Sequence, residues 1–123
     1  MGSAIVKDIM ITAYVHLLKD NEAEVRTAAA SQIPGFSTLI DPKVVLKEIL
    51  PCVKDLVTDV NVHVRASVAT QISGLSPILG KDNTIKELLP TFLQLLKDDA
   101  SEVRLNIISK LDSVNTGNLA TNK

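Results

Sequence analysis

The sequence has few of the residues on which covalent or metal chemistry usually depends. Its 123 residues include one cysteine, Cys52, one tyrosine, two phenylalanines and no tryptophan. A lone cysteine cannot form an internal disulfide or supply a cysteine-rich metal site, which indicates a reducing compartment. The two histidines, His16 and His63, each lack a second ligand at helical spacing, so no zinc site is expected. We therefore expect no metal, no cofactor and no enzymatic activity.

A marked excess of charge of either sign is also missing. Lys and Arg number 13 against 14 Asp and Glu, which gives a net charge of -1. Sequence-independent attraction to phosphate backbones requires a basic excess, so nucleic acid is not expected as a partner. No apolar run approaches about 18 residues, and the N-terminus has no basic leader before an apolar stretch. We expect neither a membrane span nor a secretory signal, and favour the cytoplasm, with the nucleus as a second compartment.

What the sequence does contain is an internal repeat. The dipeptide Val-Arg recurs at Val25-Arg26, Val64-Arg65 and Val103-Arg104, a period of 39 residues (positions 26, 65 and 104). In the same register two more columns are identical in all copies: Leu17, Leu56 and Leu95, and Asp20, Asp59 and Asp98. A fixed period of this length is typical of solenoids built from one repeated structural unit.

Each copy carries the apolar spacing of two amphipathic helices. In the second copy the first stripe comprises Leu46, Ile49, Leu50, Val53, Leu56 and Val57, and the second comprises Val64, Val68, Ile72 and Leu75. Such steps are helical, and the alternation typical of strands is absent. An isolated helical hairpin cannot bury both stripes, so the copies are expected to stack. The sequence predicts three antiparallel helix pairs at about 5–40, 42–80 and 82–115, followed by a polar tail at 116–123.

Prolines, glycines and short polar residues mark the expected helix boundaries. Pro51 and Pro90 share one column inside a first helix, where the missing amide donor predicts a bend. Pro34-Gly35 is expected to interrupt the second helix of the first copy, and Gly80 to end a helix. Capping side chains are expected at Asp41 and Asp82-Asn83 before first helices, and at Asn61 and Ser101 before second helices.

The pattern Leu-x-x-Asp followed by Val-Arg resembles the HEAT repeat, and the resemblance covers all three copies, essentially residues 5 to 114. More narrowly, residues 22–26, 76–85 and 102–109 resemble the scaffolding A subunits of protein phosphatase 2A. The resemblance implies an all-α fold, a right-handed α-α superhelix, and a non-catalytic role. It also implies that the chain corresponds to an internal segment of a longer array.

By the same resemblance, such an array holds the catalytic subunit of a Ser/Thr phosphatase together with a variable regulatory subunit of the B type. The turns between paired helices form the docking edge, and here they are residues 19–24, 58–63 and 97–102. The resemblance and the register place partner contacts at Asp20, Asn21, Glu22, Asp59, Val60, Asn61, Asp98, Asp99 and Ala100.

The periodic charges allow two interpretations. They could form a docking stripe for a partner. As in HEAT arrays, they could instead tie neighbouring repeats together, because an arginine fork can bond both turn carbonyls and an aspartate. We favour this structural ladder, which would comprise Asp20, Arg26, Asp59, Arg65, Asp98 and Arg104.

Three other features have weaker functional interpretations. The stretch from Gly74 to Lys81 superficially resembles a phosphate-binding loop, but it has one residue too many and Asp82 stands where a hydroxyl is needed. Cys52 lies at the margin of an apolar stripe and is interpreted as a packing residue. Val60 and Val62, in an otherwise polar turn, could be exposed apolar surface or could pack between turns.

Two other functions are weighed against the phosphatase scaffold. A HEAT adaptor such as a nuclear transport receptor would need many more repeats and acidic inner turns for basic cargo. A HEAT-like DNA repair enzyme would need a basic concave face with aromatic side chains, which this composition does not offer.

The outermost copies are also expected to self-associate. An array without polar capping repeats leaves apolar stripes uncovered at both ends. The sequence therefore predicts end-to-end association of this chain.

Overall fold

The computed structural model describes the backbone of residues 2–118 and the side chains of residues 5–110. All regular structure in this part of the chain is helical, which confirms the all-α solenoid expected from the repeat. The predicted boundary at residue 115 is wrong, because no proline interrupts the final helix and residues 116–118 continue it. The rest of the predicted polar tail, residues 119–123, lies outside the described residues.

Each repeat is a pair of antiparallel helical segments, and most segments are composite. The first repeat comprises α1 (Gly2–Leu18), then α2 (Ala23–Ala30) and α3 (Ile33–Ser37). The second comprises α4 (Pro42–Val44), η1 (Val45–Ile49) and α5 (Leu50–Leu56), then α6 (Val62–Gln71), η2 (Ile72–Leu75) and α7 (Ser76–Leu79). The third comprises α8 (Lys81–Asn83), η3 (Thr84–Leu88) and α9 (Leu89–Leu96), then α10 (Ser101–Asn118).

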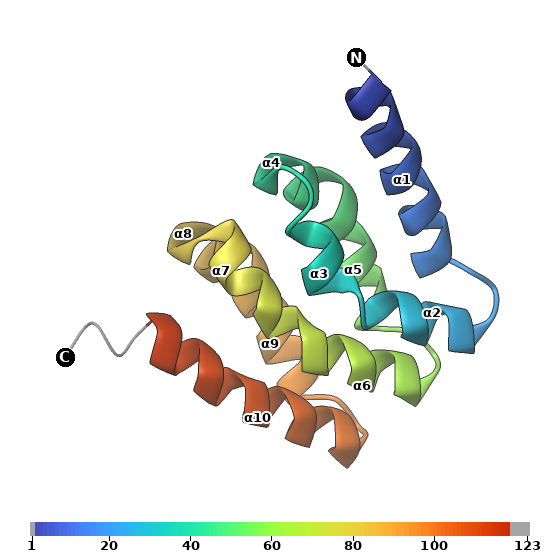
Figure 1. Cartoon of the computed structure of the whole chain (residues 1–123). Helices are drawn as coiled ribbons and strands as arrows, with labels where there is room; N and C mark the ends of the chain where they lie inside the picture. Colours follow the sequence, from blue (N-terminus) through green and yellow to red (C-terminus); the bar gives the residue numbers. More distant parts are fainter. Residues whose placement is uncertain (1, 119–123) are drawn as a thin grey trace.

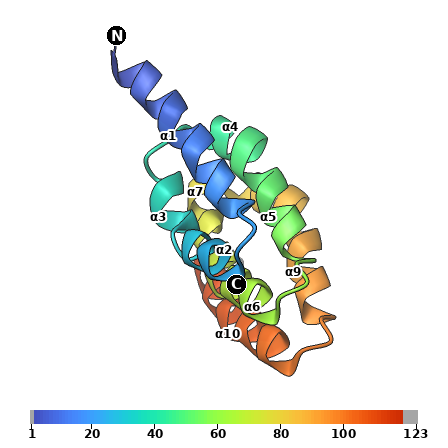
Figure 2. The same cartoon turned by 90° about the vertical axis from the view of Figure 1, so that its right-hand side faces the viewer.

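The helices form two layers (Figures 1 and 2). One layer holds α1, α5 and α9, and the other holds α2, α6 and α10, with α6 packed directly between α2 and α10. The apolar stripes predicted from the sequence meet between the layers, where the fully buried side chains include Leu18, Ile33, Ile49, Val53, Ile72, Phe92, Leu95 and Ile107. Burial of these stripes is the main force that holds the repeats together.

A π-helical turn precedes the recurring prolines of the second and third repeats. Pro51 is the second residue of α5 and Pro90 the second residue of α9, and the π-helices η1 and η3 come directly before them. Proline has no amide hydrogen, so the carbonyl that would accept it loses its usual α-helical donor, and a wider turn accommodates the ring. The first repeat has Thr12 in this column, and α1 runs without interruption.

The second helices are interrupted only where proline follows. α2 ends at Ala30 before Pro34, and the 3₁₀ segment η2 separates α6 from α7, whose second residue is Pro77. The corresponding positions of α10 are Asp112 and Thr116, and this helix is continuous. The sequence predicted the first interruption and missed the second.

Two of the four expected helix caps are present. Asp41 accepts a hydrogen bond from the amide of Lys43 at 2.8 Å, and Asn61 accepts one from the amide of His63 at 2.8 Å. The prediction at Asp82-Asn83 is wrong, because α8 already begins at Lys81, directly after Gly80 turns the chain at φ 87°. The prediction at Ser101 is also wrong, because Ser101 is the first residue of α10 rather than the residue before it.

Candidate partner-binding edge

The three turns between paired helices lie along one edge of the array, on the right-hand side of Figure 1. They comprise residues 19–22, 57–61 and 97–100, and we call them together the turn edge. The 39-residue period gives each turn the same register, so that equivalent columns recur along the edge.

Each turn is closed by its aspartate in the same way. The carboxylate Oδ1 accepts a hydrogen bond from the backbone amide two residues later, at 2.9 Å in every turn. The bonds join Asp20 to Glu22, Asp59 to Asn61 and Asp98 to Ala100. This side-chain turn fixes the backbone locally and occupies one carboxylate oxygen.

The arginines connect each turn to the next repeat. Arg26 donates from Nε to Asp59 at 2.8 Å and from its terminal NH2 group to the same carboxylate at 3.1 Å. Arg65 makes the same two bonds to Asp98, at 2.7 Å and 3.3 Å. The other terminal nitrogen of each fork donates to the carbonyl of the turn in its own repeat, Asp20 for Arg26 and Asp59 for Arg65. One planar fork therefore holds two turns at a fixed spacing.

The ladder is directional and stops at the outer repeats. Arg104 donates to the carbonyls of Asp98 and Asp99 in its own turn, at 2.6 Å and 3.1 Å. Among the residues whose side chains are described, neither Arg104 nor Asp20 takes part in an ion pair. Of the six residues assigned to the ladder, four therefore form inter-repeat pairs and these two do not.

The environment of Asp98 shows how the ladder is stabilised. Burial of this carboxyl opposes its ionisation, but the hydrogen bonds from Arg65 and from the amide of Ala100 outweigh that effect and lower its pKa. The side chains of Arg65 and Asp98 are 18% and 9% exposed, so the pair is largely shielded from water. A shielded, bidentate pair of this kind contributes more than an exposed one.

The three columns of the predicted contact set differ in what they offer to a partner. The aspartates Asp20, Asp59 and Asp98 are half-buried, and their carboxylates serve the turns. The residues that follow them, Asn21, Val60 and Asp99, are exposed in every turn. In the third column Glu22 is exposed, whereas Asn61 and Ala100 are half-buried. The outward column of the turn edge is therefore Asn21, Val60 and Asp99.

Val60 and Val62 have opposite environments. The side chain of Val60 is 95% exposed, whereas Val62 is partly buried against the core. Both interpretations left open by the sequence thus apply, one to each valine. The reason is helical register, because Val62 is the first residue of α6 and turns inward while Val60 projects from the turn.

Three exposed residues beside the turns were not among the nine expected contacts. Glu24, His63 and Glu102 occupy one column at the start of the second helices and are exposed in all repeats. They extend the turn edge by one position. The 39-residue period could have revealed them, but their differing chemistry gave no common signal.

Other groups singled out in the sequence form no site. Cys52 is buried, and burial, opposed in part by Lys19, raises the pKa of its thiol, which donates to the carbonyl of Glu48 at 3.5 Å. Gly74 packs against Pro34 of the first repeat instead of lining a phosphate loop. No cluster of three or more His, Cys, Asp or Glu side chains that could hold a metal occurs among the described residues.

The helices also differ from those that cross membranes. Within the part of the chain that the structure describes, none combines the length and the apolarity that a bilayer span requires.

Comparison with known proteins places this geometry in context. A family model described as PPP2R1A-like HEAT repeat matches residues 3–80. The chain is similar to a human protein, the beta isoform of the 65 kDa regulatory A-type component of serine/threonine-protein phosphatase 2A, with 50% identity over 63 residues. The matched region covers 48% of this chain and 10% of that relative. The similarity is therefore to a small part of a much longer protein.

Proposed function

Because this chain belongs to the PPP2R1A-like HEAT-repeat family, we propose that it is a non-catalytic scaffold segment of a protein phosphatase 2A assembly. It would contact the catalytic subunit of a Ser/Thr phosphatase, the regulatory subunit of the B type, or both, through the turn edge. The name of the human relative, which describes a regulatory component of phosphatase 2A, supports this role. The cytoplasm remains our proposal for its location.

The observation that carries the proposal is the exposed column on a rigid backbone. Val60 projects fully into solvent from a turn that is held by the Asp59 side chain and by two arginine forks. An apolar side chain on a pre-organised turn can bind a partner with little loss of conformational entropy. Polar exposed residues, Asn21 and Asp99, occupy the equivalent positions on either side.

The surroundings of Val60 define the chemistry of the partner. A hollow of about 350 Å³ lies between the second and third turns, lined in part by Thr58, Lys97 and Asp99. A partner that inserts a polar side chain there while covering Val60 would match both features. The contact would combine a small apolar centre with a polar rim, as in transient protein interfaces.

Binding of purified phosphatase subunits to the immobilised chain tests the proposal. We expect the chain to retain at least one of the two subunits, and Val60→Glu to weaken that retention by about tenfold, because a charge would be buried at the contact. Asp59 should be left intact, since its substitution would disturb the ladder as well as the surface.

Ile85→Glu is the matched control, because Ile85 is also an exposed apolar residue, 51% exposed, but lies in η3 away from the turns. Retention should be unchanged in this variant. If neither of the two subunits binds the chain, the proposal is wrong. If both bind equally well to Val60→Glu and to the original chain, the turn edge is not the docking surface.

A further inference from the structure

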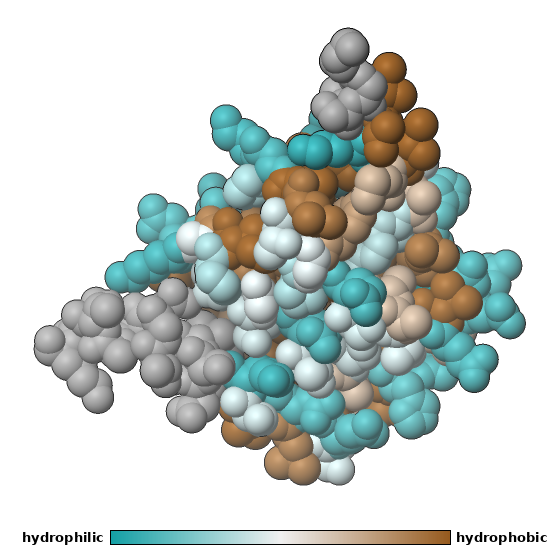
Figure 3. All heavy atoms as spheres, viewed as in Figure 1, coloured by the Kyte–Doolittle hydropathy of each residue, from teal (hydrophilic) through white to brown (hydrophobic). Residues whose placement is uncertain are grey.

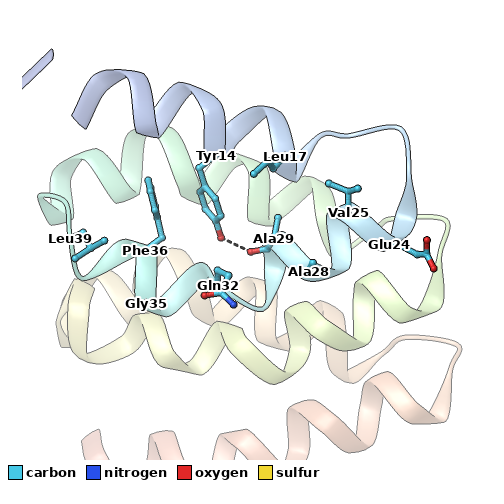
Figure 4. Close-up of a pocket in the computed structure, with 10 residues that line it drawn as sticks. All are labelled: Tyr14, Leu17, Glu24, Val25, Ala28, Ala29, Gln32, Gly35, Phe36 and Leu39. Atoms are coloured by element: carbon cyan, nitrogen blue, oxygen red, sulfur yellow. Dashed lines mark hydrogen bonds between the residues drawn. The ribbon is translucent and has the colours of Figure 1, made fainter. Parts of the chain in front are cut away.

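The outer face of the first repeat carries an open apolar groove. Its volume is about 820 Å³, and its lining includes Tyr14, Leu17, Val25, Ala28, Phe36 and Leu39 (Figure 4). We call these residues the leading groove. The hydroxyl of Tyr14 donates to the carbonyl of Ala29, and the Tyr14 ring stacks on Phe36, so the groove has firm walls.

The same columns are covered in the other two repeats. Leu17 is 45% exposed, whereas Leu56 and Leu95, its equivalents, are 3% and 0% exposed. Val25 is half-buried, whereas Val64 and Val103 are completely buried. The leading groove is therefore a stacking face of the solenoid that lacks its neighbour in this chain.

The internal junctions show what covers such a face. The second helix of the preceding repeat packs on it, α2 on α6 and α6 on α10. Two hydrogen bonds mark the register: Ser67 donates to the carbonyl of Thr27, and Asn106 donates to the carbonyl of Ala66, both at 3.2 Å. The occupant of the leading groove should therefore be the outward face of another such helix.

The third repeat presents that kind of face. Leu105 and Ile108 of α10 occupy the columns of Ala66 and Ala69 and are 64% and 53% exposed. We call these two residues the trailing face. Hydrophobic surface lies over both α1 and α10, at opposite ends of the array in Figure 3.

The sizes of the facing residues match across the two ends. At the internal junctions Thr27 meets Ser67 and Ala66 meets Asn106. In the same register Leu105 of the trailing face would meet Ala28, the smallest residue of its column. A large side chain against a small one conserves the volume of the junction, although Ala28 supplies no hydrogen bond.

The charges at the two ends are complementary as well. Arg26 pairs with Asp59 and Arg65 with Asp98, always from one repeat to the next. Arg104 has the same position without a carboxylate partner among the described side chains, and Asp20 has the same position without an arginine. Stacking a third-repeat face on a first-repeat face would bring these two residues together.

We propose that the leading groove binds the trailing face of a second copy of this chain, with Arg104 of one copy paired to Asp20 of the other. This inference does not depend on the phosphatase proposal. Such an interface is heterologous, so each copy retains one free groove and one free trailing face. Association would therefore extend into longer rows and would not stop at a closed dimer.

Sedimentation velocity over a series of concentrations tests this proposal. The chain should form dimers and then longer species as its concentration rises. Leu17→Glu should keep the chain monomeric, because it places a charge in the groove. Leu93→Glu is the matched control, since Leu93 is 49% exposed on α9 and does not line the groove, and its association should equal that of the original chain.

A charge exchange tests the pairing itself. Asp20→Arg and Arg104→Asp should each weaken association by about tenfold or more, and the chain that carries both substitutions should recover it. Circular dichroism of each variant would establish that its helices are retained.

A chain that stays monomeric at every concentration would refute the proposal. So would closed dimers that do not grow, or association that Leu17→Glu leaves intact. Weakening by Leu17→Glu without recovery in the double charge variant would also overturn it, because an unrelated contact through the apolar groove would then be the cause.

Discussion

At the scale of single residues, equivalent serines at the two junctions differ in how their hydroxyls are satisfied. Ser37 and Ser76 occupy the same column, and both are buried. The hydroxyl of Ser76 lies 3.2 Å from that of Thr84, whereas the Ser37 hydroxyl has no hydrogen-bond partner among the described residues. One repeat earlier, the position of Thr84 holds Val45. A buried hydroxyl without a partner costs stability.

We therefore expect Ser37→Ala to stabilise the chain by about 0.5–1 kcal/mol. Ser76→Ala should destabilise it by about 1 kcal/mol, because Thr84 would lose a neighbour with which it bonds. Urea unfolding followed by circular dichroism measures both. Equal effects of the two substitutions would contradict this explanation.

Two glycines in one column have different surroundings. A Cβ atom at Gly74 would lie 2.7 Å from Cγ of Pro34, whose ring cannot move aside, whereas a Cβ at Gly35 would meet nothing within 4 Å. Gly74 is therefore needed for close contact between the first and second repeats. Gly35 is in the leading groove, where the neighbouring repeat is absent from this chain.

Alanine at these positions should have opposite effects. Gly35→Ala should stabilise the chain by roughly 0.5–1 kcal/mol, since it lowers the entropy of the unfolded state. Gly74→Ala should lower stability by about 1–3 kcal/mol, because of the clash with Pro34. Thermal unfolding at a low protein concentration distinguishes the two. A stabilising Gly74→Ala would show that the two repeats are less closely packed.

At the scale of helices and turns, the same register carries both the bends and the ladder. The π-helices η1 and η3 recur one period apart because Pro51 and Pro90 do. The inter-repeat pairs recur because the aspartate and arginine columns do. The sequence predicted the bend, but the π geometry depends on how the neighbouring helix limits the movement of the chain.

The ladder predicts a difference between two arginines. Arg65→Ala should destabilise the chain by about 2–3 kcal/mol, because it leaves the shielded carboxylate of Asp98 without its fork. Arg104→Ala should cost only about 1 kcal/mol, because Arg104 bonds only turn carbonyls. Urea midpoints of dilute samples measure the difference.

Arg65→Ala should also reduce stability more than it reduces affinity for any phosphatase partner. Unchanged stability with lost binding would instead make Arg65 a contact residue.

At the scale of the whole molecule, stability is the sum of the repeats and of the interfaces between them. Each internal interface depends on one arginine and aspartate pair together with its apolar surface. The charge state of Asp98 therefore influences how well the second and third repeats hold together.

This link predicts a dependence on pH with a defined sign. The pKa of Asp98 is lower in the folded chain than its usual value of 3.8, so the stabilisation is fully present above that value. It is lost as the pH falls through the lowered folded-state pKa. The free energy of unfolding should exceed that of Asp98→Asn at about pH 7, and the difference should shrink below about pH 4. A difference that does not change with pH would contradict this.

The sequence by itself determined the period, the helix pairs, the buried stripes and the columns of the turn edge. All of these follow from repeated spacing, which any regular stacking of helices must satisfy. Only the tertiary structure decided that Arg26 and Arg65 reach forward to the next aspartate, that Val60 projects while Val62 turns inward, and that Gly74 faces Pro34. Those outcomes depend on how one repeat is placed on the next, and this placement is set by side-chain packing across junctions between residues far apart in the chain.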